Sequence, residues 1–96
     1  MTVYAIAQIS IHDRDAYSRY QARFMEVFAC FKGTLLSADE NPKVVEGTWE
    51  REKLILMSFP DEEAFNDWAL SPAYEKIAVD RKAGSTGTVI LAKGLA

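Results

Sequence analysis

The sequence predicts an α+β fold of the ferredoxin-like type, with the element order β-α-β-β-α-β and a four-stranded antiparallel sheet. Two observations carry this prediction. Strand-like and helix-like segments alternate along the chain in that order, and the strands are apolar on both faces although the helices can cover only one. The 96 residues are expected to form one domain, residues 1–96, because the chain is too short for a second core.

The first predicted strand covers residues 3–11 and is apolar on both sides over much of its length. Alternate positions from Val3 to Ile11 are apolar on one side. On the other side, Tyr4 and Ile6 come before two polar residues. A sheet with one solvated face should instead alternate apolar and polar residues, so we expect both faces to be covered.

The first predicted helix begins after Asp13, a good N-cap, and is expected to end near Gly33. Its apolar residues recur at helical spacing and form one stripe. The stripe consists of Tyr17, Tyr20, Phe24, Val27, Phe28 and Phe31.

The middle of the chain predicts two strands. The first covers residues 34–38, is interrupted around Pro42, which cannot donate to a sheet ladder, and is expected to resume over residues 44–48. The next strand, residues 53–59, is apolar on both faces. It places Ile55, Met57 and Phe59 on one side.

A second helical region follows in two pieces. Asp61 caps the first piece, and Ser71-Pro72 begins the second, which is expected to end near Gly84. Residues 85–87 are predicted to form a loop before a last strand over residues 88–92.

This element order gives a sheet with the strand order 4-1-3-2. Each helical region makes a right-handed crossover, so both lie on one face of the sheet. The opposite, apolar face would be left bare and open to aggregation. We therefore expect a homodimer in which two copies pack sheet to sheet as a dimeric α+β barrel.

Composition excludes several classes of function. The net charge is −3 and the 11 Lys and Arg residues are scattered, which argues against a nucleic-acid partner. The chain has no membrane-spanning stretch and no signal peptide, so we expect a cytoplasmic protein with no membrane partner. The lone cysteine, Cys30, excludes an internal disulfide and a cysteine-based metal cluster.

His12 is the only histidine and is a candidate general base. The alternative is a solvated residue at a strand-to-helix junction. One histidine cannot build a zinc or non-haem iron site, so no metal site and no cofactor are predicted. A single axial histidine would still suffice for haem.

Glu46 is a candidate functional carboxylate because it lies in an otherwise apolar segment. A buried carboxylate needs a partner, and we expect that partner to be Arg81, with Tyr17 and Tyr20 nearby. These residues could form the polar floor of a pocket between helices and sheet, with Trp49 at its rim or in the dimer interface. Alternatively, Glu46 and Arg81 form a structural ion pair, or Glu46 is an exposed glutamate on an edge strand.

The sequence resembles the uncharacterised bacterial family catalogued as domain of unknown function 1330, in the dimeric α/β-barrel superfamily. The resemblance covers nearly the whole chain. It depends on the order and spacing of Asp13, Tyr17, Tyr20, Glu46-Gly47, Trp49, Phe59-Pro60, Trp68, Ser71-Pro72, Tyr74 and Arg81.

The resemblance implies the same dimeric fold but does not select an activity. Members of the superfamily include cofactor-free monooxygenases, muconolactone isomerases and haem-dependent enzymes. Two hypotheses follow. The first is a small-metabolite site, with Glu46, Arg81 and His12 as candidates for proton transfer or cofactor-free oxidation. The second is a non-catalytic binding or scaffold module in which these residues are structural.

Overall fold

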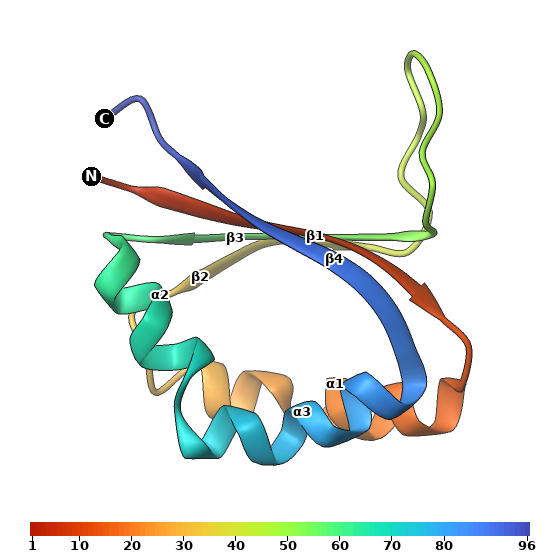
Figure 1. The fold of residues 1–96 in the computed structure, drawn as a ribbon, viewed down its shortest axis with the longest axis horizontal. Helices are drawn as coiled ribbons and strands as arrows, with labels where there is room; N and C mark the ends of the chain where they lie inside the picture. Colours follow the sequence, from red (N-terminus) through yellow and green to blue (C-terminus); the bar gives the residue numbers. More distant parts are fainter.

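The computed structural model describes residues 1–96 and has a single four-stranded sheet covered on one face by three helices (Figure 1). The elements, in chain order, are β1 (Val3–Ile11), α1 (Arg14–Phe28), β2 (Thr34–Asp39), β3 (Lys53–Phe59), α2 (Glu62–Ala69), α3 (Pro72–Gly84) and β4 (Ser85–Lys93). No helix has the length and apolar character needed to cross a membrane.

The strand order is β2-β3-β1-β4, and every neighbouring pair is antiparallel. This order is the predicted 4-1-3-2 read from the opposite edge, so the predicted fold is confirmed. In the register of the central strands, Ala5 of β1 lies opposite Met57 of β3 and Leu91 of β4. A bulge between Leu35 and Ser37 interrupts the pairing of β2 with β3.

Short polar side chains begin all three helices, as the sequence predicts. A carboxylate oxygen of Asp13 accepts a hydrogen bond from the backbone N–H of Ala16, and Asp61 does the same for Ala64, at 3.2 and 2.8 Å. Ser71 is the N-cap of α3 and is followed by proline at the first helical position.

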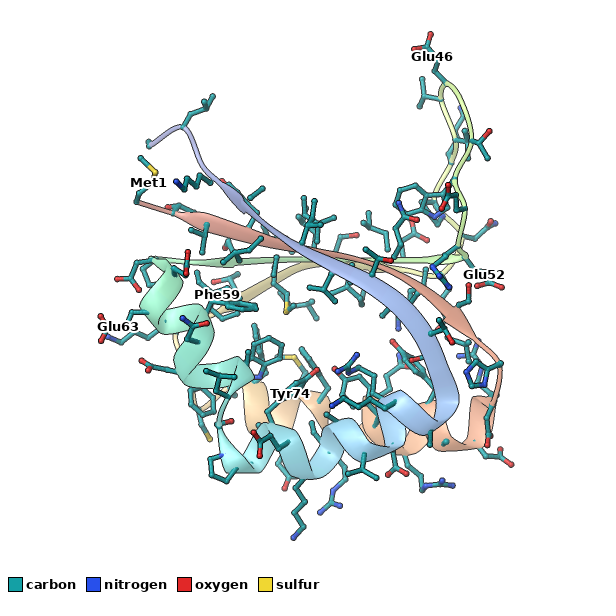
Figure 2. The ribbon with its side chains drawn as sticks, viewed as in Figure 1. Met1, Glu46, Glu52, Phe59, Glu63 and Tyr74 are labelled. Atoms are coloured by element: carbon teal, nitrogen blue, oxygen red, sulfur yellow. The ribbon has the colours of Figure 1, made fainter.

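A cluster of aromatic side chains lies at the end of the molecule where α2 approaches the sheet. The rings of Phe28, Phe59 and Trp68 pack against one another there, with centroid separations of 5.2 to 5.9 Å. Figure 2 shows Phe59 in this region, between the sheet and the helices. One of these pairs is stacked and two are edge-on, and such arrangements stabilise the core beyond the area that they bury.

The sheet face opposite the helices carries apolar side chains that nothing in the subunit covers. Ile6 lies between Leu56 and Ile90 in the register, and all three project away from the helices. Ile90 is 55% exposed. The long loop 40–52 projects from the sheet toward the same side (Figure 1).

Three predicted element boundaries are wrong. Residues 44–48 form no strand and belong to the long loop, because Pro42 removes a backbone donor and Gly47 adopts a φ of +83° that breaks an extended run. The first helix ends at Phe28, before Gly33. β4 begins at Ser85, where a loop was expected, since α3 runs directly into it.

The two termini lie side by side at one corner of the molecule (Figure 1). The backbone N–H of Gly94 donates to the carbonyl oxygen of Thr2 at 2.7 Å, and the N–H of Thr2 donates to that of Ala96 at 3.2 Å. The ends of the chain therefore extend the β1–β4 contact.

Candidate functional site

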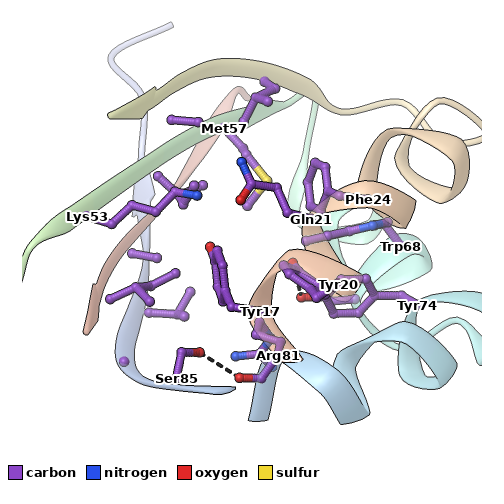
Figure 3. Close-up of a pocket in the computed structure, with 18 of the residues that line it drawn as sticks. Tyr17, Tyr20, Gln21, Phe24, Lys53, Met57, Trp68, Tyr74, Arg81 and Ser85 are labelled. Atoms are coloured by element: carbon purple, nitrogen blue, oxygen red, sulfur yellow. Dashed lines mark hydrogen bonds between the residues drawn. The ribbon is translucent and has the colours of Figure 1, made fainter. Parts of the chain in front are cut away.

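A cavity of about 430 Å³ lies between the sheet and helices α1 and α3 (Figure 3). This volume is within the range of small-molecule sites. Hydrophobic residues make up 15 of the 20 that line it, so its surface is suited to a mostly apolar molecule. Two of the lining residues, Met25 on α1 and Val89 on β4, are exposed, so the cavity opens to solvent.

The cavity exists because small residues occupy several sheet positions that face the helices. Ala7 of β1 and Gly87 of β4 line it, and Ala38 does so from β2. Larger side chains at these positions would fill the space between the two layers. The aromatic packing of Phe28, Phe59 and Trp68 holds the layers together at the other end.

Aromatic side chains form the helical wall of the cavity. Tyr17, Tyr20 and Phe24 come from α1, and Trp68 and Tyr74 come from α2 and α3. The hydroxyl oxygens of Tyr20 and Tyr74 are 3.0 Å apart and share a hydrogen bond. Burial, together with the neighbouring Tyr74, raises the pKa of Tyr20, so the Tyr20 hydroxyl stays protonated near neutral pH.

Lys53 is a buried cation in the wall that the sheet contributes. Its side chain is 2% exposed, and its Nζ lies 4.7 Å from the centroid of the Tyr17 ring. The nearest carboxylate oxygen, Oε2 of Glu40, is 3.9 Å away. Burial lowers the pKa of Lys53, although Glu40 acts in the opposite direction.

Glu40 forms a closer ion pair with Arg14 than with Lys53. Both of its carboxylate oxygens accept hydrogen bonds from the Arg14 guanidinium, at 2.9 and 3.2 Å. Lys53 therefore has only a long, shared ion pair at the edge of the cavity.

Arg81 is the second basic residue of the cavity, and it lies beside Tyr17 and Ser85 in Figure 3. Its Nε is buried without a hydrogen-bond acceptor, and so is Nε1 of Trp68. Buried donors without acceptors are rare in folded proteins and costly. No acidic residue lines the cavity, so its charged groups are both cations.

The structure brings together three of the predicted site residues and separates the others. Tyr17, Tyr20 and Arg81 line the cavity. Glu46 lies at the exposed tip of the long loop (Figure 2), and Trp49 lies in the same loop, outside the lining. The predicted contact between Glu46 and Arg81 is wrong, because the segment that carries Glu46 leaves the sheet.

His12 is exposed at the junction of β1 and α1 and does not line the cavity. The cavity accordingly has no histidine to serve as an axial haem ligand. No three His, Cys, Asp or Glu side chains lie close enough together to hold a metal ion.

Lys53 is the site residue that sequence reasoning missed, and a signal for it was present. It shares the two-residue period of Ile55, Met57 and Phe59, which all face the helices. Lys53 is the first residue of the strand predicted over residues 53–59, and its position in the period places it on the buried face, where a ligand could meet it.

The chain is similar in fold to several solved proteins. A protein of unknown function from Rhodopseudomonas palustris matches with a TM-score of 0.81 at 16% identity, covering 99% of this chain and 83% of that one. A dimeric ferredoxin-like protein of unknown function from Jannaschia matches with a TM-score of 0.77 at 13% identity, covering 98% of this chain and 100% of that one.

A third similar structure, SnoaB of Streptomyces nogalater, is a cofactor-independent oxygenase. It matches with a TM-score of 0.70 at 18% identity, covering 99% of this chain and 94% of that one. At these identities the likeness shows the fold alone. No curated protein matches the chain.

The family model described as domain of unknown function (DUF1330) matches residues 2–95. The match spans the whole fold, from the start of β1 to the end of β4, and includes every element that bounds the cavity. The chain therefore belongs to the DUF1330 family.

Proposed function

We propose that the protein binds a small, mostly apolar molecule of aromatic size that carries an anionic group, in the cavity of each subunit of a homodimer. One observation carries the proposal. The cavity is apolar and open to solvent, its only charged residues are Lys53 and Arg81, and two buried donors there lack acceptors.

The anionic group follows from the balance of donors and acceptors. An oxygen of a bound carboxylate could accept hydrogen bonds from Arg81 Nε or Trp68 Nε1, which no acceptor in the chain satisfies. Arg81 forms no ion pair with an acidic residue, so its charge is free for a ligand. The aromatic wall favours a flat ring, since stacked and edge-on ring contacts are attractive.

The homodimer is supported by the bare, apolar face of the sheet. Ile6, Leu56 and Ile90 would be buried if two copies packed through this face. The similar proteins from Jannaschia and Thermobifida fusca are described as dimeric.

Whether the bound molecule is also transformed depends on chemistry that the fold does not select. Proton transfer and cofactor-free oxidation stay predictions, and the similarity to SnoaB supports the second only at the level of fold. The scaffold alternative requires no ligand, so a binding measurement separates it from the proposed function.

The test is a thermal-shift and calorimetric titration with benzoate and indole-3-carboxylate, with the matching neutral amides as controls. A ligand at 100 times its Kd stabilises the folded state by about 2.7 kcal/mol. We expect the carboxylates to raise Tm and the amides to have a much smaller effect.

Arg81→Gln tests the anion contact, and Arg23→Gln is the matched control because Arg23 is exposed on α1 and does not line the cavity. We expect Arg81→Gln to lose most of the carboxylate response and Arg23→Gln to keep it. The proposed function is wrong if no carboxylate raises Tm, or if the amides raise it as much as the carboxylates do. It is also wrong if Arg81→Gln responds to the carboxylates as strongly as the wild type does.

A further inference from the structure

We propose that Lys53 forms an imine through its Nζ with the carbonyl group of a small aromatic aldehyde or ketone bound in the cavity. The inference rests on the proposed function for the location of the ligand, and it adds a covalent step that ligand binding alone does not require.

The first support is the position of the amine. Lys53 is the first residue of β3, and Figure 3 shows its side chain extending from the sheet into the cavity. The side chain is 2% exposed, and the apolar residues Ile55 and Ala38 line the same wall. A carbonyl compound that reaches Nζ must therefore do so from within the cavity.

The second support is that Nζ has no close polar partner in the protein. It donates no hydrogen bond to another side chain, and its nearest carboxylate oxygen is 3.9 Å away on Glu40, which is already paired with Arg14. The Tyr17 ring lies under the amine at 4.7 Å and supplies a flat surface. A structural lysine this deeply buried normally has a close acceptor.

The third support is the environment of the charge. Burial in an apolar wall destabilises the ammonium form, and the pKa of Lys53 is lowered accordingly. Glu40 acts in the opposite direction, and the charge of Arg14, a smaller effect, lowers the pKa again. A larger fraction of neutral amine is what nucleophilic lysines require.

The chemical step is balanced without an oxidant or reductant. The Nζ lone pair attacks the carbonyl carbon, and the C=O π bond opens to give a carbinolamine. Two protons pass from nitrogen to the carbonyl oxygen in the course of the reaction, and that oxygen leaves as water. The products are one C=N bond and one molecule of water.

The experiment uses the full chain with 4-carboxybenzaldehyde as the carbonyl probe and cyanoborohydride to reduce the imine. Reduction fixes the probe to Nζ as a stable secondary amine, and peptide mapping by mass spectrometry locates it. The added mass is that of the probe less one oxygen atom.

We expect the adduct to form on Lys53 in preference to the exposed lysines, and benzoate to suppress it by occupying the cavity. Lys53→Arg should lose the adduct because a guanidinium forms no imine, whereas Lys43→Arg, in the exposed loop, should keep it. The site distribution in the wild-type chain decides the question even if a Lys53 variant folds poorly.

Labelling spread evenly over the exposed lysines, or absent from Lys53, would overturn the inference. If benzoate still raises Tm under those conditions, the cavity binds anions and only the imine step fails. If neither benzoate nor indole-3-carboxylate raises Tm and Lys53 is not labelled, the proposed function fails as well.

Discussion

Tyr17 of α1 lies against Lys53 of β3, which belongs to the opposite wall of the cavity. Its ring lies under the Lys53 amine, and its side chain is 1% exposed. Burial raises the pKa of Tyr17 to about 12, with smaller contributions from Glu40 and Tyr74 in the same direction and from Arg81 and Arg14 in the opposite one. The folded state therefore holds this proton more tightly than the unfolded chain does.

This difference predicts a loss of stability at high pH. Unfolded Tyr17 releases its proton near 10.0 and folded Tyr17 near 12, so its contribution to stability is fully present below pH 10 and is lost as pH rises toward 12. The loss is at most about 3 kcal/mol, since one pKa unit corresponds to about 1.4 kcal/mol. Urea unfolding between pH 9 and pH 11 measures the first part of this loss.

Tyr17→Phe is the control, because it keeps the ring under Lys53 and removes the ionisable hydroxyl. The variant should lose less stability over this pH range than the wild type. Parallel pH curves for the two proteins would show that Tyr17 titrates alike in the folded and unfolded states.

Single residues also show what the sequence could and could not predict. Tyr17 and Tyr20 follow from helical spacing, which fixes the face of a helix. Glu46 was misplaced because its neighbours Val44 and Val45 suggest a buried strand, yet they are 50% and 91% exposed. Whether such a segment pairs depends on a partner strand at the right distance, and local sequence does not contain that information.

At the level of elements, the junction of α2 and α3 holds the aromatic wall in place. The Ser71 hydroxyl donates to the carbonyl oxygen of Trp68 at 2.7 Å and accepts from the N–H of Tyr74 at 3.1 Å. The side chains of Trp68 and Tyr74 both line the cavity, and the centroids of their rings are 4.3 Å apart. One buried serine thus links the backbones of the two residues that carry these rings.

Ser71→Ala should therefore destabilise the protein by about 1–2 kcal/mol, because a helix cap and a buried hydrogen bond are lost together. Asp61→Ala is the matched control. It removes the cap of α2 at an exposed position that makes only one of these two kinds of contact, and should cost less. Equal losses of unfolding free energy in urea would contradict this account of Ser71.

The helix starts were predictable because a cap is a local interaction between residues three positions apart. The helix and strand ends were less so, because they depend on contacts far along the chain. β4 begins directly at Ser85 because the carbonyl oxygen of Gly84 accepts hydrogen bonds from the N–H groups of His12 and Asp13. A Cβ at Gly84 would lie 2.7 Å from the backbone of α1, so only glycine allows this approach.

At the level of the whole molecule, the main feature is the apolar face of the sheet that no helix covers. Ile90 is a sensitive probe of the proposed dimer, because it is 55% exposed in one subunit and would be buried between two. Ile90→Lys should leave the isolated subunit folded and shift the dimer toward monomer, since burying an unpaired charge is costly.

Val79→Lys is the matched control. Val79 is 67% exposed on α3, on the opposite side of the molecule, so this variant should remain dimeric. Sedimentation velocity at micromolar concentration gives the mass. A wild-type protein that sediments at the 10.8 kDa of one chain would contradict the dimer.

The two ends of the chain are hydrogen-bonded to each other, so the same arrangement of helices and strands in space could be formed by a chain in which these elements follow one another in a different order. A short linker could join Ala96 to Met1 across the corner where Gly94 contacts Thr2. New ends could then open between Glu46 and Gly47, in an exposed loop outside every helix and strand. In this circular permutant, β2 and β3 would lie at opposite ends of the sequence and would still pair side by side. The strand contact that is now the shortest in sequence separation would become the longest, and the same sheet would still form.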